Sequence, residues 1–479
     1  MRARPRGRPA RPDPDRSDSH GTGRADAARP GLAARRVAAT VLAQVIDERT
    51  SLDALLDVAH GMAGFLTLDG RDRALVRAIV TTALRQRGPI TRALARFLDR
   101  PLPRGARHLE HLLHVAAAQI LYLDVADRAA IDLAVSEAND PRSRRFKGLV
   151  NAVLRRVSEN ADALRDPPPD PGDVAPWLAK AWRSDFGRER MLRMIAAQRQ
   201  EPPLDLTVAR DGPLPPGERL ATGTLRTRTR APVSQLPGYA DGHWWVQDAA
   251  ATLPAHLLGD VRGARVLDLC AAPGGKTMQL AARGARVTAV ELVANRLERL
   301  RENLERTRLA ATLVHADALE VTADGRGALG GPFDAVLLDA PCSSTGTIRR
   351  HPDVAWTKTA DDVTALAALQ ERLLVHALTL LRPGGTLVFA NCSTLKREGE
   401  DLFARVRERS DVGVSPVTPG ELWGMNVVTG QGTVRTLPHH AVPLADQAVP
   451  LADQGVSLAQ GGESPGMDGF FCARITVQS

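Results

Sequence analysis

From about residue 245 onward, short apolar runs alternate with segments of helical periodicity. The runs expected to form strands are Arg265–Leu269, Arg286–Val290, Thr312–His315, Phe333–Leu338 and Thr386–Phe389. Helical stretches near 276–283, 294–308 and 363–381 separate most of them. Because parallel strands need a crossover connection that is usually a helix, this alternation predicts an α/β domain with a parallel, doubly wound sheet.

The N-terminal half has a different pattern. Apolar residues recur there at helical spacing, and strand-like alternation is missing between residues 32 and 160. The pattern predicts an all-α domain of about five to seven helices over residues 31–160. Residues 1–30 are rich in Arg, Pro, Asp and Gly and almost lack large apolar side chains, so we expect a disordered basic tail.

Between these two parts lies a region of mixed character, 161–240. It opens with the proline-rich segment Arg165–Gly172, which is typical of a linker. Trp177 and Trp182 lie on an expected helix, and Leu204–Val208 has the pattern of a strand. The run Arg226–Arg230 would place three Arg side chains on one face if it were extended.

Near the C-terminus, residues 440–462 contain a tandem near-repeat. Val442–Gln447 reads VPLADQ, and the same six letters return at Val449–Gln454. Two such short copies cannot build a solenoid. We expect a flexible surface insertion before a last strand at Gly469–Ile475, within a domain that covers 241–479.

Positive charge is concentrated in the N-terminal half of a chain whose net charge is +8. Residues 71–107 hold ten Arg and two Asp, and residues 141–156 hold five Arg and one Lys with no acid. Any one such run is equally well a solvated basic surface. Together with the basic tail, they favour a nucleic-acid partner.

The composition of the 479 residues, 43% hydrophobic and 25% charged, is that of a globular protein. No run of about 18 apolar residues occurs, and the charged N-terminus is not followed by an apolar signal core. We therefore expect a cytoplasmic protein without membrane contact. Four cysteines with no CxxC pair exclude a disulfide scaffold and argue against a metal site.

The first expected strand runs directly into a glycine-containing turn, Cys270–Thr277, which opens a helix. Glycine there lets the backbone approach a ligand and aims free N–H groups at it. The spacing fits neither GxGxxG nor a Walker loop. Acids follow the ends of four expected strands, namely Asp268, Glu291, Asp317 and Asp339.

Ligands of doubly wound sheets bind beyond the carboxyl ends of the strands, so the four acids are expected to point into one crevice. For any single acid, a role as a turn or helix cap is favoured, and only the four together favour a ligand site. Acids with a glycine turn suit adenosine that carries a positive sulfonium. Lys276 either caps the loop or touches a carboxylate of the ligand.

Two cysteines lie at the ends of successive expected strands. Cys342 belongs to Asp339–Ser343, and Cys392 stands between Asn391 and Ser393. Such a pair suits methylation at C5 of cytosine, which needs a thiolate on C6 and then a group that helps remove the C5 proton. The residues alone leave open which thiol is the nucleophile. Cys270 and Cys472 are expected to be packing residues.

Three strings resemble the RNA 5-methylcytosine methyltransferases over residues 240–479: DLCAAPGGKT, DAPCSSTG followed by RRHPD, and NCS followed by REGE. Phe146–Arg155 is similar to a box of the NusB-like RNA-binding domain. Together with Val246–Asp248, these resemble the bacterial RsmB/Sun class, which methylates small-subunit ribosomal RNA.

The resemblance implies a Rossmann-like domain with a mostly parallel seven-stranded sheet and S-adenosylmethionine as cofactor. The residues that would hold the cofactor are Cys270, Ala271, Ala272, Pro273, Gly274, Gly275, Lys276, Glu291, Asp317 and Asp339. It makes Cys392 the nucleophile and Cys342 the residue that assists product release. Asp339 would touch N3 of the base, and Arg349 and Arg350 would lie near the RNA. A monomer without metal is expected.

The sequence departs from the family pattern at a few places. Asn391 stands where Thr is usual, Ser344 where Gly is common, and Glu291 where Asp is frequent. The 440–460 insertion has no recognised counterpart. The Asn leaves the rate of the reaction open.

The main hypothesis is an RNA cytosine-C5 methyltransferase acting on small-subunit ribosomal RNA, with 31–160 and 161–240 contacting RNA. The alternatives are a transfer-RNA enzyme of the same chemistry and a non-catalytic RNA-binding or assembly factor. A DNA enzyme is less favoured, because those enzymes carry their nucleophile in a Pro-Cys box after strand four.

Overall fold

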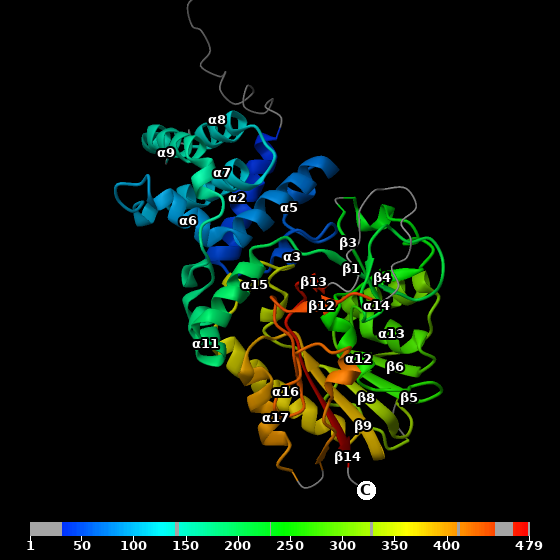
Figure 1. Ribbon diagram of the computed structural model, residues 1–479. Helices are drawn as coiled ribbons and strands as arrows, with labels where there is room; N and C mark the ends of the chain where they lie inside the picture. The colour runs from blue at the N-terminus through cyan, green and yellow to red at the C-terminus, as the bar shows by residue number, and fades with distance from the viewer. Residues whose placement is uncertain are drawn as a thin grey trace, which may run out of the picture.

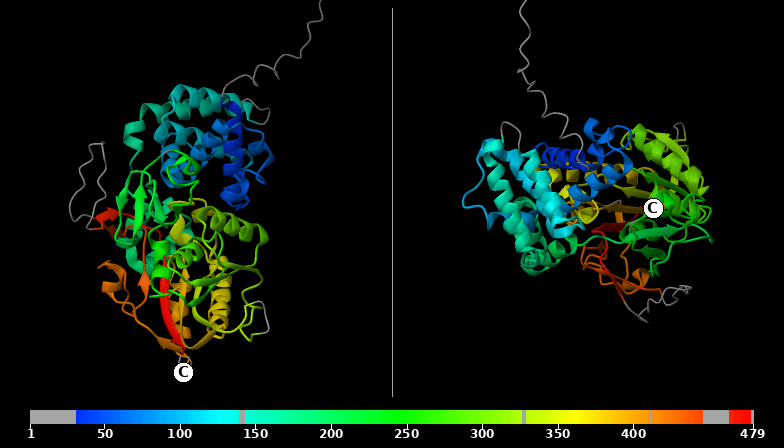
Figure 2. Two further views of the ribbon diagram at one scale, coloured as in Figure 1. Left: turned by 90° about the vertical axis from the view of Figure 1, so that its right-hand side faces the viewer. Right: turned by 90° about the horizontal axis from the view of Figure 1, so that it is seen from above.

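The computed structural model describes residues 31–138, 143–229, 231–325, 329–409, 412–445 and 463–477. The predicted basic tail, 1–30, and most of the predicted insertion lie outside these residues. A helical bundle stands over a sheet-containing domain, as Figure 1 and the left view of Figure 2 show. No helix of the described residues has the length and apolar character needed to cross a membrane.

The N-terminal part is all helical, as predicted. Its longer helices are α2 (Leu32–Asp47), α5 (Gly70–Arg85), α6 (Arg87–Ala95), α7 (Arg107–Tyr122), α8 (Asp127–Glu137) and α9 (Lys147–Glu159). Short helices are α3 (Leu52–Leu55), α4 (Ala63–Leu66) and α10 (Ala161–Leu164). Helix α7 is buried along most of its length and packs against α2, α5, α6, α8 and α9. A helix that is apolar on nearly all sides fits only at the centre of a bundle.

The proline-rich segment predicted as a linker is anchored at its end. The buried Asp173 carboxylate accepts a hydrogen bond from Arg92 of α6 and lies 3.7 Å from the Arg199 guanidinium. The next helix, α11 (Pro176–Gln198), carries the buried Trp182, whose indole N–H donates to Thr394 Oγ1 over 2.9 Å. Helix α11 therefore packs on the sheet domain rather than standing between two separate bodies.

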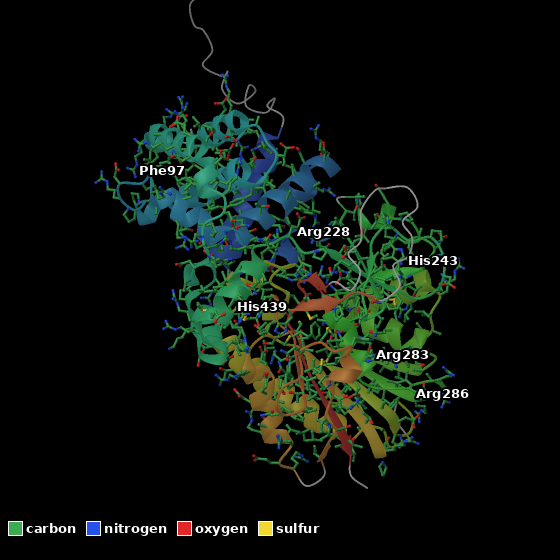
Figure 3. All side chains as sticks on the ribbon, in the orientation of Figure 1. Phe97, Arg228, His243, Arg283, Arg286 and His439 are labelled. Atoms are coloured by element: carbon green, nitrogen blue, oxygen red, sulfur yellow. The ribbon has the colours of Figure 1, made fainter. Side chains whose placement is uncertain are left out.

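A small antiparallel sheet follows, in the order β2-β3-β1-β4. Its strands are β1 (Leu204–Val208), β2 (Glu218–Arg219), β3 (Thr224–Thr227) and β4 (Trp244–Val246). Of the described arginines in the run Arg226–Arg230, only Arg226 lies in a strand, so the row of three on one face stays a prediction. Arg226 is buried, because it pairs with the buried Asp205 through two hydrogen bonds of 2.8 Å. Arg228, labelled in Figure 3, is exposed just past the strand, and Arg230 lies outside the described residues.

The main sheet has the order β10-β14-β9-β8-β5-β6-β7, and a short β11 pairs with β14 outside this path. Its strands are β5 (Arg265–Leu269), β6 (Arg286–Glu291), β7 (Thr312–His315), β8 (Phe333–Asp339), β9 (Leu381–Asn391), β10 (Val412–Val414), β11 (Val434–Arg435) and β14 (Phe471–Val477). Strands β5 to β9 are parallel, and the β10, β11 and β14 pairings are antiparallel. The mostly parallel, doubly wound sheet is therefore confirmed.

Helices cover both faces of this sheet, because the strand side chains alternate between two cores. One core includes Val266, Leu337 and Leu280 of α13 (Gly275–Ala282), together with α12 (Leu253–His256). The other includes Leu267 and Val336 with α16 (Ala360–Leu378) and α17 (Glu400–Val406). Helix α14 (Ala294–Thr307) packs beside α13.

The helical bundle meets the sheet domain at the carboxyl ends of the parallel strands. The Leu52 N–H at the start of α3 donates to Asp353 Oδ2 over 3.1 Å. Asp53 lies 3.3 Å from the ring of His351, and Asp57 lies 2.9 Å from Arg299 of α14. Any ligand that reaches the strand ends therefore enters beneath the bundle.

We predict that Asp205→Ala lowers the free energy of unfolding by about 3–5 kcal/mol, because it leaves the buried Arg226 guanidinium without its counter-charge. Urea denaturation of the full chain measures the loss. Replacing the exposed Asp211 by Ala serves as the control. The double variant Asp205→Leu/Arg226→Met should lose less than Asp205→Ala, and a larger loss would contradict this account.

Candidate active site

The turn after β5 has a backbone that only glycine allows at one position. Gly274 has a φ of 102°, and a Cβ atom there would lie 2.1 Å from Leu300 Cδ1 of α14. Helix α13 begins at the next residue, Gly275. The turn Cys270–Lys276 therefore presents backbone close to the crevice, and the first amides of α13 face its opening.

Of the four predicted acids, Asp268, Glu291 and Asp339 lie together at the strand ends. Asp268 is buried in β5, where one oxygen accepts the Thr277 hydroxyl over 2.6 Å and the other has no partner among the described residues. Burial raises the pKa of Asp268 to about 7, and the charges of Asp339 and Glu291 add to the rise. The strand ends thus carry clustered acidic side chains, one of which has an unsatisfied buried oxygen.

Glu291 ends β6, and Asp317 follows β7. The buried Glu291 carboxylate accepts the N–H of Ala272 over 3.2 Å and that of Val293 over 3.0 Å. Asp317 lies two residues beyond β7, and its Oδ1 accepts the Leu319 N–H. Glu291 therefore ties the glycine turn to β6, while Asp317 stands further along the edge.

Lys276 closes the crevice on the side of the thiols. Its Nζ lies 2.6 Å from Asp339 Oδ2 and 5.2 Å from the centre of the Phe470 ring. Burial alone would lower the pKa of Lys276, but the Asp339 carboxylate raises it above its ordinary value. The lysine is therefore a cation held in place by Asp339.

The two thiols predicted to share the crevice are in contact. Cys342 follows β8, Cys392 follows β9, and their sulfur atoms are 3.4 Å apart. The hydrogen bond between them lowers the pKa of Cys392 against the effect of burial, and Lys276 acts in the same direction. The same bond, together with burial, raises the pKa of Cys342. Cys392 is thus the better thiolate and Cys342 the proton donor to it.

The other two cysteines are inert by the same criterion. Burial raises the pKa of Cys270 and of Cys472 to about 12 in each case. Neither sulfur forms thiolate at neutral pH, which agrees with their prediction as packing residues.

One buried carboxylate, Glu398, joins the loops of the two thiols. Its oxygens accept hydrogen bonds from the Ser343 N–H and hydroxyl, from the Ser393 hydroxyl and from the Gln370 amide. Sequence reasoning used this glutamate only as part of the REGE string. The sequence feature that could have identified Glu398 is its spacing of six residues from Cys392, which places it in the turn that follows the nucleophile.

Asn391, the departure from the family pattern, has a defined structural role. Its buried side-chain amide donates to the Glu398 carbonyl over 2.7 Å, and its oxygen accepts the Ser393 N–H over 3.0 Å. It thus closes the turn that carries Cys392.

Arg349 and Arg350, expected to lie near the RNA, are engaged within the protein. Both guanidinium groups pair with Asp248 and Asp468, at distances between 2.5 and 3.3 Å, and all four side chains are largely buried. Two acids far apart in the sequence, which the motif does not contain, thus surround the arginines, and their placement near the RNA stays a prediction.

Family models match both parts of the chain. A model described as 16S rRNA methyltransferase RsmB/F matches residues 255–443, and a NusB family model matches residues 32–159.

Among the described residues, no group of three or more His, Cys, Asp or Glu has the arrangement of a metal site.

Curated relatives match over most of their length. A protein named ribosomal RNA small subunit methyltransferase B from Xanthomonas campestris is 40% identical, covering 82% of this chain and 92% of the relative. One of the same name from Pseudomonas putida is 37% identical, covering 78% and 88%. The crystal structure of PH0851 aligns with a TM-score of 0.64 at 20% identity, covering 94% of this chain and 99% of that one, and shows the shared fold.

We predict that Cys342→Ala shifts alkylation of Cys392 by iodoacetamide to higher pH. The thiolate is the reactive form, and the variant removes the hydrogen bond that most lowers the pKa of Cys392 while its burial remains. Mass spectrometry of each cysteine after timed alkylation at several pH values measures the profile. Cys472→Ala is the control, and an unchanged or lowered profile in Cys342→Ala would contradict the assignment.

We also predict that Glu398→Gln slows alkylation of Cys392 at neutral pH and lowers the melting temperature. The amide group of Gln would face hydrogen-bond donors, so at least one bond worth about 1.5–3 kcal/mol is lost and the two thiol loops separate. Glu408→Gln, at an exposed site ten residues on, is the matched control. Wild-type behaviour of both variants would show that Glu398 does not position the thiols.

Proposed function

Because the chain belongs to the RsmB/F family of 16S rRNA methyltransferases, we propose that it methylates C5 of a cytosine in small-subunit ribosomal RNA. The observation that carries the proposal is the contact between the Cys342 and Cys392 sulfur atoms, with pKa values moved in opposite directions. Cytosine-C5 chemistry uses one thiolate and one group that handles a proton.

The residues of the crevice fit S-adenosylmethionine, which supplies an activated methyl group when bound. The left-handed Gly274 lets the backbone approach an adenosine, and the buried, unpartnered Asp268 oxygen calls for a polar ligand atom. The acids Glu291 and Asp339 suit hydroxyl donors and positive charge. The residues proposed to hold it are Cys270, Ala271, Ala272, Pro273, Gly274, Gly275, Lys276, Glu291, Asp317 and Asp339.

In the first step, the Cys392 thiolate adds to C6 of the cytosine and forms a sulfur–carbon bond. Electron density moves to C5, which then takes the methyl group. The contact with Cys342 lowers the pKa of Cys392 and so favours the thiolate before the base arrives. Asp339, fixed by Lys276, would contact the N3 edge of the base, where the N4 amino group can donate a hydrogen bond to its carboxylate.

In the second step, Cys342, which can lose its own proton to solvent once Cys392 is bonded to carbon, takes the proton from C5. The C5–C6 double bond then reforms and Cys392 departs as thiolate. Cys342 lies in contact with Cys392 and on the loop after β8, so it is positioned to assist this elimination. Glu398 and Asn391 hold the geometry but do not touch the reacting atoms.

The NusB-like bundle stands over the strand ends, and we infer that it contacts the RNA. Curated relatives named for the small subunit, at 37–40% identity, favour a ribosomal over a transfer RNA. The pair of contacting thiols argues against a non-catalytic factor, which would have no use for it.

We predict that Cys342→Ala, mixed with cofactor and RNA, forms a denaturant-resistant protein–RNA adduct. Methyl transfer should proceed while release of the C5 proton fails, so Cys392 stays bonded to C6. The double variant Cys342→Ala/Cys392→Ala should form no adduct, and Cys472→Ala should turn over normally. Denaturing gel electrophoresis with labelled RNA measures the product. An adduct that requires Cys342 and survives loss of Cys392 would reverse the two roles.

A further inference from the structure

A cavity of about 870 Å³ lies beside the active site and takes no part in the chemistry above. Its walls come from α11, from the loop 424–431 and from the segment that leads into β12 (Ala441–Pro443). Lys396, four residues after Cys392, lines it, as does Arg435, whose guanidinium donates to the Ser393 carbonyl. The volume is typical of small-ligand sites, which span about 300–1,000 Å³.

The sheet order shows what the cavity adjoins. The glycine turn and Glu291 follow β5 and β6, and the thiols follow β8 and β9, which lie in line across the sheet. Arg435 belongs to β11, which pairs with β14 on the far side of β9. The cavity therefore lies past the nucleophile, on the side away from the cofactor residues.

Several polar groups of the cavity are available for a ligand. Within the described residues, the side chains of Arg190, Asn426 and Gln431 are exposed and form no hydrogen bond or ion pair, and Arg193 only approaches Glu189 at 3.6 Å. Of the three acids on the wall, Asp401 is exposed to solvent, and the other two are engaged. Glu400 pairs with Arg435 at 2.6 Å, and Asp185 accepts the Lys396 N–H.

Two imidazoles provide flat surfaces in the same cavity. The rings of His439, labelled in Figure 3, and His440 meet edge to face with centroids 4.8 Å apart. Burial, with the nearby Arg charges, lowers the pKa of each to about 4, so both rings are neutral. His439 Nδ1 is buried without a hydrogen-bond partner among the described residues. Neutral rings suit stacking on a nucleobase, and an orphaned nitrogen suits one hydrogen bond to it.

We propose that this cavity binds a single-stranded RNA nucleotide that flanks the target cytosine. Arg190 and Arg193 contact its phosphate, His439 and His440 lie against its base, and the amides of loop 424–431 read the base edge. The target base must leave its stack to reach Cys392, which leaves its neighbours unpaired and able to enter an adjoining site. The inference rests on the proposed function.

The test compares Arg190→Ala/Arg193→Ala with Arg188→Ala, an exposed arginine of the same helix outside the cavity. Fluorescence anisotropy with labelled 16S ribosomal RNA fragments gives the Kd, and methyl transfer gives KM and kcat. In the double variant we expect Kd and KM to rise about tenfold or more, with kcat and cofactor affinity unchanged. The slope of log affinity against log salt should fall by about 0.7 for each lost phosphate contact.

The base contact is tested separately by His439→Ala and Asn426→Ala. These variants should change the preference for the flanking nucleotide in a set of RNA fragments while leaving the salt slope as in wild type. Unchanged Kd, KM and salt slope in the double arginine variant would overturn the cavity assignment while transfer by the wild type continues. If the wild type transfers no methyl group to any RNA, the proposed function fails, and the anisotropy comparison still decides whether the cavity binds RNA.

Discussion

A single buried carboxylate, Glu398, determines whether the two thiols can meet. It lies between the loop after β8 and the loop after β9, and accepts donors from both. A buried carboxylate is stable only when hydrogen bonds satisfy it. Removing any donor would therefore lower the stability of the fold, because the buried charge would be less well satisfied. Gly346 completes the join, because its N–H donates to the Cys392 carbonyl and a Cβ there would lie 1.9 Å from the Gly469 oxygen. The 3.4 Å contact between the sulfur atoms therefore follows from loop packing rather than from the cysteines themselves.

The need to pair buried charges also explains the structural role of the RRHPD segment. Arg349 and Arg350 join Asp248, ahead of the sheet, to Asp468, just before β14, so the two ends of the domain close around the active-site edge. Breaking one partner of such a buried group is costly, whereas an exposed ion pair contributes little. In the same segment, His351 and Asp353 contact the helical bundle at α3. One short segment thus sets both the closure of the domain and the placement of the bundle over it.

Much of this arrangement could be predicted from the sequence because it depends on periodicity. Apolar runs and helical spacing predict the parallel strands. The rule that ligands bind at strand ends predicts that Cys342 and Cys392 lie close together. What could not be predicted depends on partners distant in the chain. The residues near Arg226 in the sequence do not indicate that Asp205 will neutralise it. A run of basic residues has the same sequence pattern whether its side chains face solvent or a buried acid. Glu398 was missed for the same reason, since its donors come from three separate elements.

The division of labour between the thiols is set by a balance of nearby charges. Lys276 lowers the pKa of Cys392, but Asp339, which Lys276 neutralises, raises it. The effect of Asp339 is the larger of the two, and the hydrogen bond with Cys342 is the largest influence that favours the thiolate. The N4 amino group of an arriving base, donating to Asp339 as proposed, would offset part of the opposing charge while Lys276 remains. Arrival of the base would then increase the fraction of thiolate at Cys392, which couples nucleophile strength to the presence of the substrate.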